Sequence, residues 1–170
     1  MTVTASRDCA SALSDSLSEQ GFGPFFGTPC GILAPLFRRL DDHSQLVAIA
    51  REDNAVGIAA GASMAGHAPV VMMQNSGLGQ SVNAIASLVV PYVVPMLLIV
   101  SMRGVPPDDT SENVVMGRIT ESVLDGAGIP TAWLNADGIG DQVAWARDLV
   151  VDRRTPAALL VPPGLFGWRP

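Results

Sequence analysis

The sequence contains no lysine, and its ten basic residues, all arginines, are outnumbered by 16 acidic residues. The formal net charge of −6 and the absence of a basic patch exclude a nucleic-acid-binding surface. The two cysteines, Cys9 and Cys30, are too few for a disulfide framework. No charged, apolar and small-residue signal peptide opens the chain, so we expect a cytoplasmic location.

A long uninterrupted apolar run is also missing. The longest run, residues 85–100, contains Pro91 and Pro95, and a membrane-spanning helix needs about 20 apolar residues. We therefore interpret this run as a loop that feeds a buried strand, and we expect no membrane association. The chain is nevertheless 48% apolar, which suffices for a hydrophobic core and excludes a disordered chain. Its 170 residues fit one domain, residues 1–170.

Helical and strand-like patterns alternate along the chain. Apolar strands between helices indicate an α/β fold: a three-layer, doubly wound, mostly parallel sheet with helices on both faces, as in flavodoxin-like domains. The predicted helices span residues 6–19, 32–40, 53–65, 77–88, 112–126 and 139–151. The predicted strands span residues 25–26, 45–50, 69–73, 95–100, 132–134 and 157–161.

The carboxyl ends of the strands are the expected place for a site. Ligands of open parallel sheets bind outside these ends, so four loops matter most: residues 27–31, 51–54, 74–79 and 101–104. The tail, residues 162–170, is too short to form a domain. One interpretation of the tail is an arm that packs on a partner.

The loop after the third predicted strand is rich in polar and glycine residues. Gln74, Asn75 and Ser76 precede Gly77 and Gly79, which open a helix, and amides at a helix N-terminus favour anions. The segment nearly matches the dinucleotide fingerprint, but the acidic residue expected about 20 positions later is missing. Two interpretations remain, a tight turn and a ligand site. The three polar groups favour a ligand, because they need partners at the end of a buried strand.

Glu52 and Asp53 stand between a strand and an Ala-rich helix. Either carboxylate could stabilise the helix N-terminus. If Asp53 does so, Glu52 is left for another role, such as sharing a proton with a ring nitrogen. Cys30, in the first loop, could face a ligand or act as a small packing group.

Arg103 follows the fourth predicted strand. Its guanidinium could bind a phosphonate, sulfonate or carboxylate through two parallel hydrogen bonds. It could equally pair with Asp108, Asp109 or Glu112 of the following loop. The sequence leaves both alternatives open.

Four segments together resemble a known family. GTPCGIL at residues 27–33, REDNAVGIAAG at 51–61, MQNSGLG at 73–79 and PMLLIVSMRG at 95–104 occur in this order. They resemble the pyrimidine-binding (PYR) domain of thiamine-diphosphate enzymes, and most of all the α subunits of sulfopyruvate and phosphonopyruvate decarboxylases. The resemblance extends over about residues 20–130.

The resemblance implies roles for particular residues. A glutamate at the position of Glu52 is the catalytic residue of the family: it contacts N1′ of the aminopyrimidine and promotes its imino tautomer. The cofactor, thiamine diphosphate, does the bond breaking, while the protein orients and tunes it. The implied cofactor-binding residues are Glu52, Gln74, Asn75, Ser76 and Gly77, and the implied substrate-binding residues are Thr28, Pro29, Cys30 and Arg103.

The resemblance also implies a partner. In the family the diphosphate is held through Mg²⁺ by a Gly-Asp-Gly segment followed by an asparagine, and Mg²⁺ prefers oxygen ligands. The nearest segment here is Ala136-Asp137-Gly138, with no asparagine after it. We therefore expect no metal site and no diphosphate-binding (PP) domain in this chain. A separate β subunit would carry the PP domain and the Mg²⁺, and the PYR domain itself would form a homodimer.

Three functions follow from the resemblance as expectations. The first is a decarboxylase α subunit that converts 3-phosphonopyruvate or 3-sulfopyruvate to the aldehyde and CO2, and that works only with its β subunit. The second is a subunit of a split carboligase similar to acetolactate synthase. The third is a non-catalytic partner subunit, against which the intact Glu52 argues.

Overall fold

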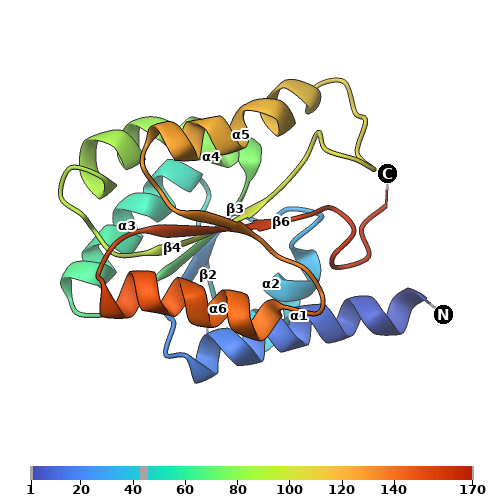
Figure 1. Cartoon of the computed structure of the whole chain (residues 1–170), viewed down its shortest axis with the longest axis horizontal. Coiled ribbons are helices and arrows are strands. Elements are labelled where there is room, and N and C mark those ends of the chain that lie inside the picture. Colours follow the sequence, from blue (N-terminus) through green and yellow to red (C-terminus); the bar gives the residue numbers. More distant parts are fainter. Residues whose placement is uncertain (1, 43–45, 170) are drawn as a thin grey trace.

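The computed structural model describes residues 2–42 and 46–169, and its centre is one parallel sheet of six strands in the order β2-β1-β3-β4-β6-β5 (Figure 1). The three central strands are almost entirely buried. Their unbroken apolar sequences suit strands that helices cover on both faces. The strands are β1 (Phe25–Gly27), β2 (Leu46–Ala48), β3 (Val70–Gln74), β4 (Leu97–Ser101), β5 (Thr131–Trp133) and β6 (Ala157–Val161).

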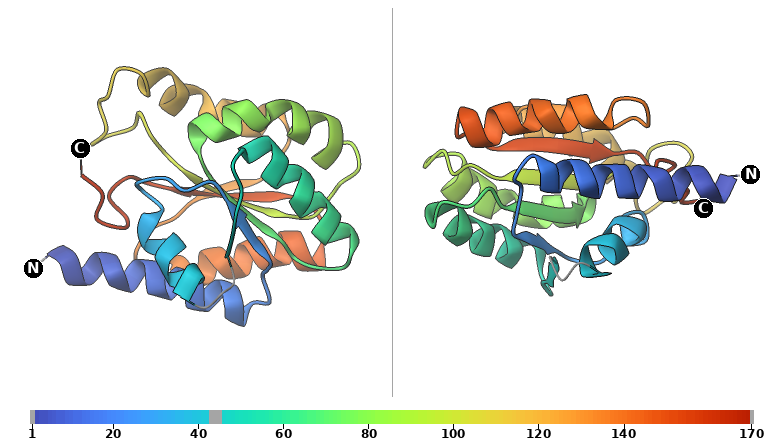
Figure 2. Two further views of the ribbon diagram at one scale, coloured as in Figure 1. Left: turned by 180° about the vertical axis from the view of Figure 1, so that it is seen from behind. Right: turned by 90° about the horizontal axis from the view of Figure 1, so that it is seen from below.

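Helices cover both faces of the sheet, and each face has its own apolar core (Figure 1). One layer consists of α1 (Thr2–Glu19), α2 (Ala34–Asp42) and α6 (Ile139–Arg147), and the other of α3 (Glu52–Met64), α4 (Asn75–Ala84) and α5 (Val114–Gly126). Seen from behind, α3 and α4 lie side by side (Figure 2). The predicted three-layer, doubly wound α/β fold is confirmed.

The predicted boundaries differ from the observed ones in a few places. Two helices end in π-helical turns, η1 (Ile85–Val89) after α4 and η2 (Asp148–Asp152) after α6. The start of the apolar run at residues 85–100 is therefore helical, as the predicted helix over residues 77–88 implied, and the loop that feeds β4 begins only after it. Gln45, the predicted first residue of the second strand, lies outside the described residues. Within the described part of the chain, no helix has the length and apolar character needed to cross a membrane.

The order of the strands along the sheet changes direction between β1 and β3. After β1 the chain enters α2 on one face of the sheet, and after β3 it enters α4 on the other face. Folds of this kind bind ligands at the carboxyl ends of two adjacent strands whose following loops lead to opposite faces of the sheet. A Cβ on Gly27, the last residue of β1, would lie 2.8 Å from the backbone oxygen of Met72. Glycine is therefore needed for the close approach of β1 to β3.

Candidate functional site

Glu52 begins α3 at the carboxyl end of the sheet, and its side chain lies over Gly77 of α4. A Cβ on Gly77 would come within 2.5 Å of Glu52 Oε1 and 2.6 Å of its Cδ, so the carboxylate occupies the space that this glycine leaves open. Glu52 is partly buried. Among residues 2–42 and 46–169, no donor is hydrogen-bonded to its carboxylate, so both oxygens are available to a ligand.

Asp53 takes the role at the helix end. Its carboxylate accepts hydrogen bonds from Arg51 Nη2 at 2.8 Å and from the backbone N–H of Asn54 at 2.9 Å. The hydrogen bond from Arg51 lowers the pKa of Asp53. Of the two carboxylates that local sequence left as alternatives for the helix end, Asp53 is therefore the one paired locally, and Glu52 is the one without a hydrogen-bond partner among the described residues.

The polar loop after β3 divides into an outward and an inward part. Gln74 is half-buried and its Nε2 donates to Oγ of the exposed Ser76 at 2.8 Å. Asn75, in contrast, is fully buried. Its Nδ2 donates to the backbone oxygen of Arg103 at 2.9 Å and to Thr120 Oγ1 at 3.3 Å, and its Oδ1 accepts from the N–H of Arg103 at 3.3 Å. Asn75 thus ties the loop after β3 to the loop after β4.

The loop after β1 lies against both of its neighbours. Thr28 Oγ1 donates to the backbone oxygen of Ile49 at 3.0 Å, beyond the end of β2. Cys30 Sγ and Ser101 Oγ, at the end of β4, lie 3.2 Å apart. Pro29 is exposed between them. The fold thus brings Thr28, Pro29 and Cys30 to the same edge of the sheet as Arg103.

Arg103 pairs with Asp108, one of the three acidic residues that the sequence offered. Arg103 Nε lies 2.5 Å from Asp108 Oδ2, and Nη2 lies 3.4 Å from Thr110 Oγ1. The Asp108 side chain is 0% exposed and that of Arg103 is 22% exposed. The hydrogen bond from Arg103, followed by those from Thr110 and the N–H of Gly104, holds the pKa of Asp108 well below its usual range.

The C-terminal tail packs on its own chain. Trp168 lies over the guanidinium of Arg103, with 4.8 Å from the Arg103 Cζ to the ring centroid. A Cβ on Gly31 would lie 3.6 Å from Trp168 Nε1, which is ordinary van der Waals contact. The tail therefore packs on the carboxyl edge of its own chain, whereas one interpretation of the sequence was an arm that packs on a partner. Figures 1 and 2 show the tail at the same end of the molecule as the start of α1.

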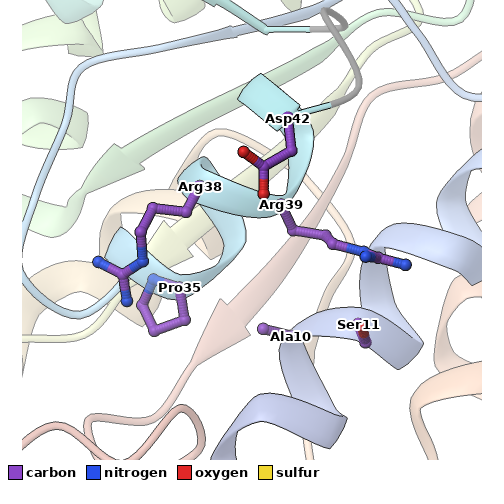
Figure 3. Close-up of a pocket in the computed structure, with 6 residues that line it drawn as sticks. All are labelled: Ala10, Ser11, Pro35, Arg38, Arg39 and Asp42. Atoms are coloured by element: carbon purple, nitrogen blue, oxygen red, sulfur yellow. The ribbon is translucent and has the colours of Figure 1, made fainter.

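A hollow of about 440 Å³ lies between α1 and α2, and none of the predicted site residues lines it (Figure 3). The two arginines that line it, Arg38 and Arg39, point in different directions, so they do not converge on one anion. Within the residues that the structure describes, no group of three or more His, Cys, Asp or Glu side chains could hold a metal ion.

Comparison with known proteins agrees with this geometry. Residues 7–121, well over half of the chain, match the family described as thiamine pyrophosphate enzyme, N-terminal TPP binding domain. The chain belongs to this family. The PYR-domain resemblance read from the sequence is thereby confirmed.

Several relatives of this PYR-domain chain have assigned names. Sulfopyruvate decarboxylase subunit alpha of Methanocaldococcus jannaschii is 38% identical over 71% of this chain and 72% of the relative. Its counterpart in Methanococcus maripaludis is 30% identical over 91% and 94%. Phosphonopyruvate decarboxylase of Streptomyces viridochromogenes is 31% identical over 95% of this chain but only 42% of that longer protein.

A solved structure confirms the fold. A 2-oxoglutarate:ferredoxin oxidoreductase from Magnetococcus marinus, solved with 2-oxoglutarate, coenzyme A and succinyl-CoA bound, superimposes with a TM-score of 0.73. The superposition covers 95% of this chain and 29% of that chain, with 16% sequence identity. At this identity the likeness extends to the fold alone.

Sequence reasoning missed the supporting roles of three residues, Ser101, Thr120 and Trp168, and left that of a fourth, Asp108, open. Ser101 and Thr120 are fully buried partners of Cys30 and Asn75. Asp108 was considered only as one of three partners for Arg103, and Trp168 was assigned to an arm. A short polar residue at the end of an apolar strand was the available signal for Ser101. No local pattern indicated Trp168.

Proposed function

We propose that this chain is the α subunit of a two-subunit thiamine-diphosphate-dependent decarboxylase. Its substrate would be 3-sulfopyruvate or 3-phosphonopyruvate, and its products the aldehyde and CO2. The observation that carries the proposal is the Glu52 carboxylate, which lies over Gly77 with no protein donor. The names of the relatives support the reaction. Sulfopyruvate is favoured because the sulfopyruvate α subunits are similar to this chain over most of their own length.

The residues around Glu52 fit the aminopyrimidine end of the cofactor. A carboxyl group without a protein partner can hold a proton at N1′ of the pyrimidine, as the family requires. Gly77 makes room for the Glu52 side chain because it has no Cβ, and Gln74 and Ser76 precede it in the same loop. Asn75 is buried and bonded to protein, so we assign it a positioning role in place of the expected cofactor contact. When bound, thiamine diphosphate supplies the electron sink for decarboxylation.

The substrate end of the site would be formed by Thr28, Pro29, Cys30 and Arg103. Asp108 occupies Nε and Nη2 of Arg103, while a guanidinium has five N–H donors in a planar fork. Nη2 also donates to Thr110 Oγ1 at 3.4 Å, so the N–H groups of Nη1 are the ones left to bind an oxygen of the sulfonate or phosphonate. Arg103 would hold the anionic end of the substrate while the 2-oxo group faces the cofactor.

The proposal includes a partner for the other end of the cofactor. A β subunit with a PP domain would bind the diphosphate through Mg²⁺, and this chain, a single PYR domain over residues 1–170, would contribute Glu52 to a site between the subunits. Homodimerisation of the PYR domain and a cytoplasmic location belong to the same proposal. The printed name "subunit alpha" of the relatives supports a partner subunit.

The test is reconstitution with a candidate β subunit encoded beside this chain. The purified complex, with Mg²⁺ and thiamine diphosphate, is assayed for aldehyde and CO2 from sulfopyruvate and phosphonopyruvate. We expect turnover by the complex and none by this chain alone. Glu52→Gln should lower kcat by at least about 10²-fold, within the range for a positioned proton-transfer group. Asp53→Asn, a matched loss of the neighbouring carboxylate, should leave kcat within twofold.

Either of two results would overturn the assignment. Full activity of the Glu52→Gln complex would remove Glu52 from the chemistry. A stable complex that forms a carboligation product from added acceptor, with no free aldehyde, would identify a carboligase in place of a decarboxylase.

A further inference from the structure

The tail after β6 is folded so that Trp168 must face the carboxyl edge of the sheet. Phe166 is 3% exposed and belongs to the apolar core beneath α1, α2 and α6. Turns closed by Leu165 N–H to Pro162 O at 3.1 Å and Gly167 N–H to Gly164 O at 3.0 Å reverse the chain. Gly167 has a φ of +78°, which glycine adopts without strain. The residue after it is Trp168.

Trp168 joins two loops that carry the proposed substrate residues. Its indole lies over the guanidinium of Arg103 at 4.8 Å, and a Cβ added to Gly31, in the loop after β1, would lie 3.6 Å from its Nε1. Asp108 holds the same guanidinium by its Nε edge at 2.5 Å. Arg103 is therefore fixed in two directions, along one edge by a carboxylate and across one face by an aromatic ring. Nη2 is also bonded, to Asp108 and Thr110, so these contacts fix the direction in which the remaining terminal nitrogen, Nη1, points.

We propose that Trp168 is a positioning residue that sets the orientation of Arg103 and thereby selects 2-oxoacids with an anionic tail over those without one. The inference rests on the proposed function and adds a residue outside the segment that matches the family, residues 7–121. A guanidinium that is already immobilised binds an oxyanion with a smaller loss of side-chain freedom. Stacking on an indole retains the charge and leaves the edges free for hydrogen bonds.

The test compares Trp168→Ala and Trp168→Phe in the complex with the β subunit. Phe166 anchors the tail independently, so we expect both variants to fold. In Trp168→Ala, KM for sulfopyruvate should rise about tenfold, which equals about 1.4 kcal/mol, while kcat stays within twofold. The kcat/KM for pyruvate, which has no anionic tail, should not change. Trp168→Phe retains a ring face over Arg103 and should restore the KM to within about threefold.

The control is Trp133→Phe. Trp133 lies on the edge strand β5 and its Nε1 donates to Glu121 at 2.9 Å, so this variant removes an indole without touching Arg103. It should leave the ratio of kcat/KM for sulfopyruvate and pyruvate unchanged. An equal fall of both kcat/KM values in Trp168→Ala would indicate a tail that only stabilises the fold, and no change in either would exclude a role. Both results overturn the inference.

Failure of the proposed function can be distinguished from failure of this inference. If the wild-type complex decarboxylates neither anionic substrate, the proposed function is wrong, and binding then decides about Trp168. In Trp133→Phe/Trp145→Phe, Trp168 is the remaining one of the three tryptophans. Its emission should change on titration with sulfopyruvate, and this change should disappear in the additional variant Arg103→Met. No change in emission at saturating sulfopyruvate would refute the inference independently of activity.

Discussion

Replacing Asp108 by asparagine would remove the charge that holds Arg103 while retaining the size of the side chain. The Asp108 carboxylate accepts hydrogen bonds from Arg103 Nε at 2.5 Å, from the backbone N–H of Gly104 at 2.8 Å and of Thr110 at 3.3 Å, and from Asn113 Nδ2 at 3.3 Å. An amide at this position would turn an NH2 group toward some of these donors. Asp108→Asn should therefore loosen the whole loop after β4.

The cost can be bounded from the burial of the two partners. Breaking a buried ion pair costs about 3–5 kcal/mol when the remaining charge stays buried. The Arg103 side chain is 22% exposed, whereas that of Asp108 is 0% exposed, so water can rehydrate part of the guanidinium. We expect the free energy of unfolding to fall by about 2–3 kcal/mol. At about 2–4 °C per kcal/mol for a domain of this size, Tm should fall by about 5–10 °C.

The same carboxylate predicts a pH dependence. Its pKa in the folded chain is lowered, chiefly by the hydrogen bond from Arg103, whereas an aspartate in the unfolded chain titrates near 3.9. The unfolded chain therefore binds the proton first as the pH falls. The stabilisation by Asp108 is complete at neutral pH and is lost progressively below about pH 4. Asp108→Asn should differ from the wild type by less at pH 3 than at pH 7.

Urea unfolding at pH 7, followed by circular dichroism, measures the difference directly. Asp109→Asn is the matched control, because Asp109 is the exposed neighbour of Asp108, and its effect should stay within about 0.5 kcal/mol. An Asp108→Asn variant that unfolds within the same 0.5 kcal/mol of the wild type would contradict the buried ion pair. A larger gap at pH 3 than at pH 7 would contradict the lowered pKa.

Two further substitutions test the support of the site. Gly77→Ala would place a Cβ 2.5 Å from Glu52 Oε1. We expect kcat of the complex to fall by about 10²-fold, as for a misplacement of a catalytic group by about 1 Å. The control Gly140→Ala, whose added Cβ would have no atom within 4 Å, should have no effect. Thr120→Val would remove the hydroxyl that accepts from Asn75 at 3.3 Å. Urea unfolding should show a loss of about 1–2 kcal/mol, and a neutral result would show that the hydrogen bond between Asn75 and Thr120 does not stabilise the fold.

The parts of the site that the sequence predicted are those set by local patterns and by the rules of parallel sheets. The apolar strands and their helices determine that the loops after β1, β2, β3 and β4 meet at one edge. For this reason the sequence alone predicts Glu52 at the same edge of the sheet as Gln74 and Gly77. The contact between Glu52 and Gly77 follows from the small residues of α3 and α4, which let the two helices lie close together.

The parts that could not be predicted depend on contacts between distant segments. Whether Arg103 pairs with Asp108, Asp109 or Glu112 depends on the path of a proline-containing loop, and all three carboxylates have the same local chemistry. The contact of Trp168 with Arg103 depends on the turns after β6, which no periodic pattern encodes. Asn75 resembles Gln74 and Ser76 in sequence, and only its complete burial distinguishes it as a structural amide from the less buried Gln74 and the exposed Ser76.

These distant contacts join the part of the carboxyl edge that carries Glu52 to the part that carries Arg103. Asn75 begins the helix that carries Gly77, against which Glu52 lies, and both ends of its amide are bonded to the backbone of Arg103. Cys30 and Ser101 connect the loops after β1 and β4 in parallel with this link. The separation between the carboxylate of Glu52 and the guanidinium of Arg103 is therefore set within this chain. In the proposed enzyme, a β subunit would have to supply the diphosphate and Mg²⁺ but not the distance between the pyrimidine end and the anion-binding end of the site.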